Sequence, residues 1–313
     1  MKKENSPWKW VLVIIFLIIL AFTSLFVAAI VAVFVGLSSE EASATGNVAL
    51  IPISGTIVTE KEDFLFERDI VSADEIIKLI DKADKDPSIQ AIMFEINSPG
   101  GSAVASDEIA SRIKKLQKPT VSYIREVGAS GAYWIASSSN YIIANRMSIT
   151  GSIGVIASYL EFSGLLEQYN ITYQRLVSGK YKDIGTPFKK LTREEEILLQ
   201  NILEDIKQNF IDAVAENRKL SKEKVEDMAT GLFYLGSQAK DLGLVDELGG
   251  KEEAILYLQE KLNTTIEVAE YKKSKSFFEL LSEALNEQSF YVGEGIGSSL
   301  IEKSRVETLK VLT

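Results

Sequence analysis

A long apolar run near the N-terminus constrains this chain more than any other feature. Residues 11–37 are interrupted only by Thr23, Ser24 and Gly36. At ~1.5 Å per residue, a helix of this length exceeds the ~30 Å thickness of a bilayer core. We therefore predict one transmembrane helix over residues 11–37, preceded by a short segment, 1–10. A cleaved signal peptide is the alternative, since residues 42–44 read Ala-Ser-Ala, but the run is about twice as long as the usual apolar region of ~7–15 residues.

The charges that flank this run predict its orientation. Lys2, Lys3 and Lys9 precede it, whereas Glu40 and Glu41 follow it. Because lysine and arginine are enriched on the cytoplasmic side of membrane spans, we expect a cytoplasmic N-terminus. The rest of the chain would then lie outside the cell membrane, with membrane lipid as the partner of the helix.

Two missing residue types limit the chemistry. The 313 residues include no Cys and no His, so disulfides, thiol nucleophiles and every Ser-His or Cys-His mechanism are excluded. We expect no metal and no cofactor, and acid–base catalysis must use another group, such as lysine or a carboxylate. The net charge of −10 argues against a nucleic-acid partner.

The remainder of the chain divides into a stem (38–47), a domain (48–271) and a tail (272–313) that carries no recognisable motif. In the first half of the domain, strand and helix patterns alternate. We predict strands at 48–58, 89–96, 120–125 and 141–144, and helices after Ser72, from about 103 and from about 131. This order predicts βαβ crossovers and an α/β fold with a parallel or mixed sheet.

The second half of the domain is predicted to be mainly helical. Thr192 and Glu195 have the spacing of a capping box, which would open a long helix whose apolar face docks on the sheet. Residues 221–262 look helical, with a break at Gly231 and a turn at 249–250. Short strands are expected at 173–177 and 266–271.

Two glycine-rich turns follow predicted strands. In the first, residues 97–101, adjacent glycines would leave backbone N–H groups unshielded, as an oxyanion hole requires. In the second, residues 128–132, small residues flank Ser130, whose oxygen would feel the positive end of a helix dipole. Each turn also has a simpler interpretation, a strand-to-helix connection for the first and an N-cap serine for the second.

A serine nucleophile without histidine needs another base, and a lysine can serve if burial lowers its pKa. Lys180 and Lys182 lie in one loop after a predicted strand. Asp183 would raise the pKa of Lys182 if the two side chains paired. The residues alone do not decide between the two lysines.

Four motifs occur together in a fixed order: residues 96–101 (INSPGG), 128–133 (GASGAY), 150–155 (TGSIGV) and 178–183 (SGKYKD). This set resembles the signal peptide peptidase A family of membrane-anchored serine proteases, over about residues 48–250. The family belongs to the Clp-protease and crotonase superfamily. The resemblance therefore implies a spiral of βαβ units, in agreement with the α/β pattern.

The resemblance also implies a role for individual residues. Ser130 would be the nucleophile, Lys182 the general base and acid, and Ser152 the group that orients the lysine amine. Gly101 and Gly131 would donate their N–H groups to the oxyanion, with Gly100 required for the turn. It further implies a homo-oligomeric ring that cleaves signal peptide remnants and other small or unfolded polypeptides outside the membrane.

Two alternatives remain at this stage. An inactive scaffold with the same fold would keep Ser130 and Lys182 too far apart for proton transfer. A crotonase-type acyl-CoA enzyme would use similar N–H donors, but the outward orientation disfavours it. For the tail, we predict that residues 306–313 dock in the active site as an extended, substrate-like strand.

Overall fold

The structure is a computed structural model that describes residues 7–39, 46–60 and 70–272. These residues fall into two units, an N-terminal helix and the body that contains the rest. Most of the predicted stem and almost the whole tail, including residues 306–313, lie outside the described residues.

The N-terminal unit is the helix α1 (Pro7–Ser39), which contains the whole predicted span. Within it, Trp10–Val27 has a mean hydropathy of 3.0 and is long and apolar enough to cross a membrane. The hydroxyls of Thr23 and Ser24 donate to the carbonyls of Leu20 and Ala21, each at 2.9 Å. These two polar side chains thus make their hydrogen bonds within the helix itself, which is compatible with a membrane anchor.

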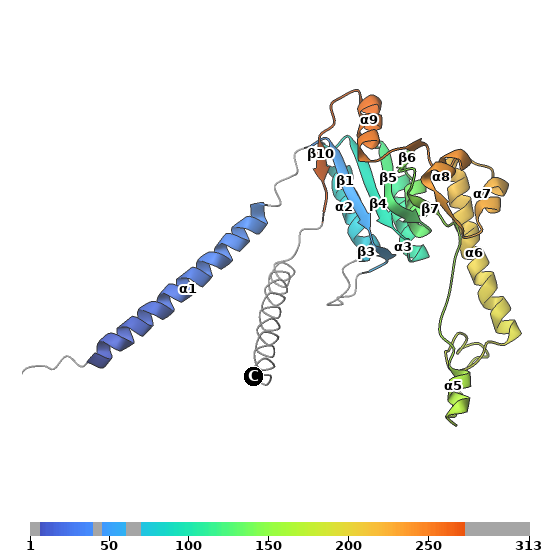
Figure 1. Cartoon of the computed structure of the whole chain (residues 1–313), viewed down its shortest axis with the longest axis horizontal. Coiled ribbons are helices and arrows are strands. Elements are labelled where there is room, and N and C mark those ends of the chain that lie inside the picture. The colour runs from blue at the N-terminus through green and yellow to red at the C-terminus, as the bar shows by residue number, and fades with distance from the viewer. Residues whose placement is uncertain (1–6, 40–45, 61–69, 273–313) are drawn as a thin grey trace, which may run out of the picture. The chain divides into compact units, whose positions relative to one another are not determined.

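The body is an α/β fold built on a mostly parallel sheet, as the sequence predicts (Figure 1). The main path runs β10–β1–β4–β5–β6–β9, with all neighbours parallel. These strands are β1 (Val48–Ser54), β4 (Ala91–Ser98), β5 (Thr120–Ala129), β6 (Tyr141–Ala144), β9 (Glu247–Leu248) and β10 (Val268–Glu270). A separate parallel pair is formed by β2 (Thr56–Val58) and β3 (Ile70–Ser72). The architecture is consistent with a Clp/crotonase-like fold.

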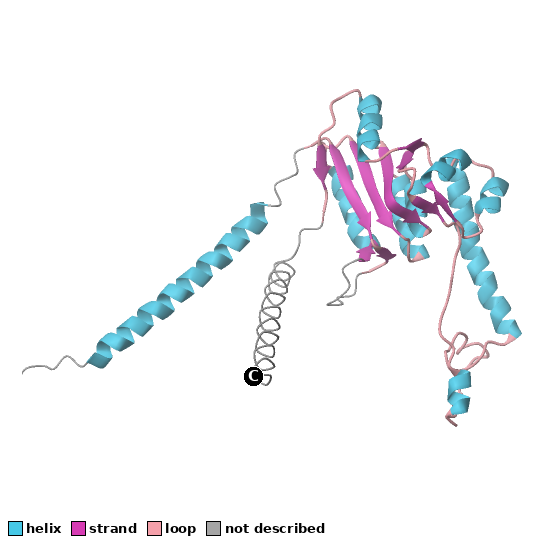
Figure 2. Ribbon diagram, in the orientation of Figure 1, coloured by secondary structure: helices cyan, strands magenta, loops and turns pink. Residues whose placement is uncertain are grey.

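Helices cover both faces of the sheet (Figure 2). One face packs against α2 (Ala73–Lys85), α3 (Ala103–Lys114) and α4 (Gly131–Ser137) in the larger core, which includes Phe94 and Tyr133. The same core takes in α7 (Lys222–Met228) and α8 (Gly236–Leu242). The opposite face packs against α9 (Lys251–Leu262) in a smaller core around Met93 and Leu258.

Strand β5 has two successive neighbours along one edge. Its first half pairs with β6, and its last residues, 127–129, pair with β7 (Ile149–Gly151). In turn, β7 pairs in antiparallel fashion with β8 (Phe233–Leu235), a strand that lies within the region predicted to be helical. Because β5 and β7 are parallel, the residues that follow them, Ser130 and Ser152, emerge at the same edge of the sheet.

Capping residues begin the two helices for which the sequence predicts them. The hydroxyl of Ser72 accepts from the N–H of Glu75 at 3.2 Å, and α2 starts at the next residue. Thr192 and Glu195 form a reciprocal capping box at the start of α6 (Arg193–Arg218). Both predictions are confirmed.

Two further expectations about the second half were wrong. Residues 173–177 do not form a strand. Only the C-terminal half of α6 packs on the body, through Phe210, Ile211 and Val214, whereas Ile197 and Ile202 are exposed. The periodicity of the sequence predicts which face of this helix is apolar, but it does not predict how much of that face packs against the body.

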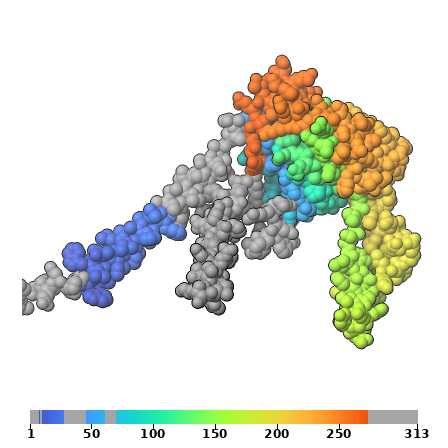
Figure 3. All heavy atoms as spheres, viewed as in Figure 1, coloured from blue at the N-terminus to red at the C-terminus, as the bar shows by residue number. Residues whose placement is uncertain are grey.

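The segment that precedes α6 projects away from the sheet. We call residues 155–192 the arm; it contains the short helix α5 (Ser163–Gln168) and lies beside the first half of α6 (Figures 1 and 3). Several of its apolar side chains are exposed, among them Ile156 at 83%, Leu160 at 73% and Leu176 at 97%. So much exposed apolar surface is typical of an interaction site.

Candidate active site

Ser130 lies at a sharp turn between the end of β5 and the start of α4. Its backbone has φ 53° and ψ −127°, which is unfavourable for a residue with a side chain and costs about 1–3 kcal/mol. The turn is held by two hydrogen bonds, from the N–H of Ser130 to the carbonyl of Gly151 at 2.8 Å and from the N–H of Trp134 to the carbonyl of Ser130 at 3.0 Å. A strained backbone that its neighbours fix in this way is common at functional sites.

The hydroxyl of Ser130 does not cap the helix that it precedes. It occupies the N-cap position of α4, yet its side chain makes no capping hydrogen bond. Within the described body it has no other hydrogen-bond partner, and the residue is partly exposed. The N-cap interpretation is therefore wrong, and the hydroxyl is free to react.

The Gly100–Gly101 turn packs directly against this serine. Gly100 has φ 99°, and a Cβ there would lie 2.8 Å from the N–H nitrogen of Gly131 and 2.9 Å from the Cβ of Ser130. A Cβ at Gly101 would collide with the carbonyl oxygen of Ile57. Both glycines are thus required by close backbone contacts, as well as by the local turn.

The two N–H groups proposed as oxyanion donors belong to backbone segments that lie side by side. A Cβ at Gly131 would lie 3.5 Å from the nitrogen of Gly101, so the two backbones are adjacent. Across the ranges that the structure describes, neither the Gly101 N–H nor the Gly131 N–H has a hydrogen-bond partner. Two unpaired donors next to a serine hydroxyl can stabilise a developing negative charge on a carbonyl oxygen.

Two buried hydroxyls that are not among the predicted site residues support this turn. The Ser98 hydroxyl donates to the carbonyl of Gly55 at 2.6 Å and accepts from the N–H of Gly100 at 3.1 Å. The Ser106 hydroxyl donates to the carbonyl of Ser102 at 2.8 Å and lies where a Cβ on Gly131 would be. Ser98 belongs to the first glycine motif, so its position was available as a signal, but its buried contacts were not.

Ser152 follows β7 as Ser130 follows β5. It also has a positive φ, 51°, and its N–H donates to the carbonyl of Leu232 at 2.9 Å. Its hydroxyl donates to the carbonyl of Gly231 at 3.2 Å. The fold thus brings Ser130, Ser152 and the glycine turn together at one edge of the sheet.

The structure does not bring Lys182 to this group. Lys182 lies in the arm and is exposed, and it makes no side-chain hydrogen bond or ion pair with Ser130, Ser152 or any other described residue. Separation of Ser130 from Lys182 within one chain is what the scaffold alternative predicts. If the serine and the lysine act together, they must come from different chains or a different conformation.

The two lysines of the loop have different surroundings. The ammonium of Lys180 is paired with Glu194 on α6 at 2.6 Å, and this contact raises the pKa of Lys180. Asp183 does not pair with Lys182; it accepts two hydrogen bonds from Arg175, at 2.6 and 2.9 Å, which lower the pKa of Asp183. Lys182 is thus left without a carboxylate partner in the described part of the arm.

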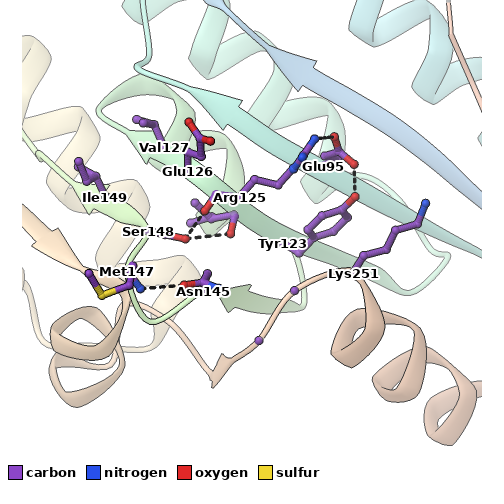
Figure 4. Close-up of a pocket in the computed structure, with 13 residues that line it drawn as sticks. Glu95, Tyr123, Arg125, Glu126, Val127, Asn145, Met147, Ser148, Ile149 and Lys251 are labelled. Carbon is purple, nitrogen blue, oxygen red and sulfur yellow. Dashed lines mark hydrogen bonds and ion pairs between the residues drawn. The ribbon is translucent and has the colours of Figure 1, made fainter.

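A pocket of about 770 Å³ lies on the α9 side of the sheet, and none of the predicted site residues lines it. Figure 4 shows the hydroxyl of Tyr123 and the guanidinium of Arg125 both directed at Glu95. Burial raises the pKa of Tyr123, and the hydrogen bond to the Glu95 carboxylate raises it further. The pocket reaches Val127, three residues before Ser130 and so about 10 Å away along the strand.

The chain is similar to several proteins that are named as proteases or candidate proteases. A profile of peptidase family S49 matches residues 112–265, a range that contains Ser130, Ser152 and Lys182. The candidate protease MJ0651 of Methanocaldococcus jannaschii is 36% identical over 245 residues, which cover 77% of this chain and 76% of that protein. The candidate signal peptide peptidase SppA of Enterococcus faecium is 35% identical over 243 residues, covering 76% of this chain and 71% of that protein.

A third relative, protease 4 of Haemophilus influenzae, is 31% identical over 242 residues, covering 76% of this chain and 38% of that protein. Together with the α/β fold, these matches define a serine-type peptidase. The chain belongs to peptidase family S49, which confirms the resemblance to the signal peptide peptidase A family.

Proposed function

We propose that this protein is a membrane-anchored serine endopeptidase that uses a Ser-Lys dyad. The Ser130 hydroxyl attacks the scissile carbonyl and gives its proton to the amine of Lys182, which then protonates the leaving amine. Water hydrolyses the resulting acyl-enzyme with the lysine again as base. The observation that carries the proposal is the free Ser130 hydroxyl beside two unpaired backbone N–H groups.

The N–H groups of Gly101 and Gly131 stabilise the oxyanion of the tetrahedral intermediate. Preorganised donors of this kind are fixed before the reaction and need no reorganisation when the charge develops. Ser152 orients the amine of Lys182, for which its place at the end of β7, beside Ser130, is suited. Gly100 forms the turn that places these N–H groups beside Ser130.

Lys182 is a better base than Lys180 because of the carboxylates around them. A lysine acts as a base only when it loses its proton, and an adjacent carboxylate opposes that loss. Glu194 holds the ammonium of Lys180 in its charged form, whereas Lys182 has no such partner among the described residues. This contrast supports the assignment that the resemblance implies.

A second copy of the chain supplies the lysine. Within one chain Lys182 lies in the arm, which projects away from the sheet (Figure 3). The arm also exposes apolar side chains, such as Ile156 and Leu176. A neighbouring copy in a homo-oligomeric ring would cover this apolar surface and bring Lys182 to the partner's serine. Repetition of the same contact around a closed ring gives every subunit one complete site.

The anchor and the substrates follow from the same proposal. Helix α1 holds the protein in the cell membrane with the N-terminus in the cytoplasm and the catalytic domain outside. The substrates are polypeptides released at that surface, including signal peptide remnants and other small or unfolded chains. The relative from Enterococcus faecium, which is named a signal peptide peptidase, supports this substrate class.

Replacement of Gly131 by alanine is expected to slow cleavage by about 10²-fold, because the new Cβ collides with the Ser106 hydroxyl and displaces one oxyanion donor. Steady-state rates on a fluorogenic apolar peptide would measure the loss. Combining Gly131→Ala with Ser106→Ala removes the colliding oxygen and should recover part of the rate. Equal rates for wild type and Gly131→Ala would contradict a role for this N–H group.

The decisive experiment mixes two inactive variants. Ser130→Ala and Lys182→Met chains, each inactive alone, are co-expressed, purified as full chains in detergent and assayed on the same peptide. If the dyad spans two copies, random pairing gives a complete site at about a quarter of the positions, and activity returns to that level. Mixed assemblies that stay inactive would contradict a shared site. An inactive wild type would favour the scaffold alternative.

A further inference from the structure

Charged side chains in the arm, which carries Lys182, form ion pairs with acids at the start of α6. Lys180 is paired with Glu194 at 2.6 Å, and Lys189 with Glu195 at 2.6 Å. Glu194 and Glu195 both lie in the first turn of α6, the helix beside this loop. Glu196, the third acid of that turn, is paired with Arg193 at 2.8 Å, so all three carboxylates already have a cationic partner other than Lys182.

Asp183 is the carboxylate of the loop itself, and it is the residue next to Lys182 in the chain. Arg175 holds it through two parallel hydrogen bonds, and the Asp183 side chain is only 10% exposed. The same guanidinium donates to the backbone carbonyl of Lys180 at 3.1 Å, which fixes the start of the loop. Lys189 is 3.9 Å from Asp183 and is engaged by Glu195, so Arg175 is the main partner of this carboxylate.

We propose that Arg175 is a positioning residue that keeps Asp183 away from Lys182 and thereby leaves the amine of Lys182 free to lose its proton. A bidentate guanidinium–carboxylate pair is well suited to this task, because it satisfies both oxygens of the carboxylate in a fixed geometry. The inference rests on the proposed role of Lys182 as the base. It adds a residue outside the four motifs to the machinery.

The test follows the protonation of Lys182 directly. Full chains in detergent are treated briefly with acetic anhydride across a range of pH, and acetylation of Lys182 is read by peptide mass spectrometry. Arg175→Ala frees Asp183 to pair with Lys182, so the pH of half-maximal labelling should rise by about one unit. At pH values below that midpoint, labelling should fall by about tenfold.

Two further variants separate the electrostatic role from a structural one. Arg175→Ala combined with Asp183→Asn removes the freed carboxylate and should return the midpoint to that of wild type. Arg193→Ala frees Glu196 from an exposed ion pair on α6 and should leave the midpoint unchanged. The pH dependence of peptide cleavage should move in parallel with labelling in all four proteins.

An unchanged midpoint in Arg175→Ala would overturn the inference. A shift that Asp183→Asn does not reverse would also overturn it, because it would mean that the loop had simply lost its structure. Acetylation of Lys182 does not require peptide cleavage, so it tests the proposed role of Arg175 even if the protein cleaves no peptide. Absence of cleavage in wild type would instead count against the proposed function.

Discussion

Replacing Ser130 with alanine should abolish peptide cleavage, with a loss of about 10⁴-fold or more, and should leave the protein folded. The loss is large because no other group in the proposed mechanism can form the acyl-enzyme. The fold should survive because the Ser130 hydroxyl makes no capping hydrogen bond, and alanine can retain the backbone of the turn. Initial rates and the thermal unfolding midpoint would be compared with those of wild type.

A matched control for this substitution is Ser221→Ala. The Ser221 hydroxyl caps α7 by accepting from the N–H of Lys224 at 3.2 Å, so its removal should cost about 1 kcal/mol of stability. Its effect on the cleavage rate should be small. The two serines should therefore give opposite results, activity lost with stability kept at Ser130, and stability reduced with activity kept at Ser221. Normal cleavage by Ser130→Ala would refute the proposed nucleophile.

Replacing Lys182 with methionine should lower the rate by about 10³-fold or more, whereas Lys180→Met should have little effect. Methionine keeps much of the length of lysine but has no amine to accept the serine proton. Lys180 and Glu194 form an exposed pair, and such pairs contribute little to stability. Steady-state kinetics on the same apolar peptide would measure both variants.

The comparison between the two lysines also decides which of them acts. If Lys180→Met were inactive and Lys182→Met active, the base would be Lys180 and the assignment based on the resemblance would be wrong. If both retained activity, neither lysine would be the base. Sedimentation of each variant would check that the subunits still assemble, because the arm that carries both lysines also exposes apolar surface.

The sequence predicted the elements around the serine well. Short-range signals determine these elements: the capping residues Ser72 and Thr192, the apolar strand before the first glycine turn, and the glycines themselves. Each of these signals acts within a few residues of the chain, so it can be read without knowledge of the fold. Even so, the N-cap interpretation of Ser130 failed, because its hydroxyl does not bond to the helix.

The parts that could not be predicted depend on contacts between distant residues or between chains. Nothing local indicates that β7 replaces β6 beside β5, or that Leu232 contacts Ser152. Residues 173–177 have the composition of a strand, yet they pair with no strand among the residues that the structure describes. In the same way, the apolar residues on the first half of α6 indicate a buried face but do not identify what buries it.

Strand β5 pairs first with β6 and then with β7 along one edge, and this arrangement also limits where residues can be inserted or deleted. Residues 145–148 join β6 to β7, and two hydrogen bonds hold Ser148 in this connection. Its hydroxyl donates to the carbonyl of Ile124 at 3.1 Å, and its own backbone carbonyl accepts from the N–H of Gly236 at 2.8 Å. One residue inserted at 145–148 would have to break these two bonds or displace β7, and a one-residue shift of β7 against β5 would turn its side chains to the opposite face. We therefore expect the connection between β6 and β7 to tolerate insertions and deletions poorly.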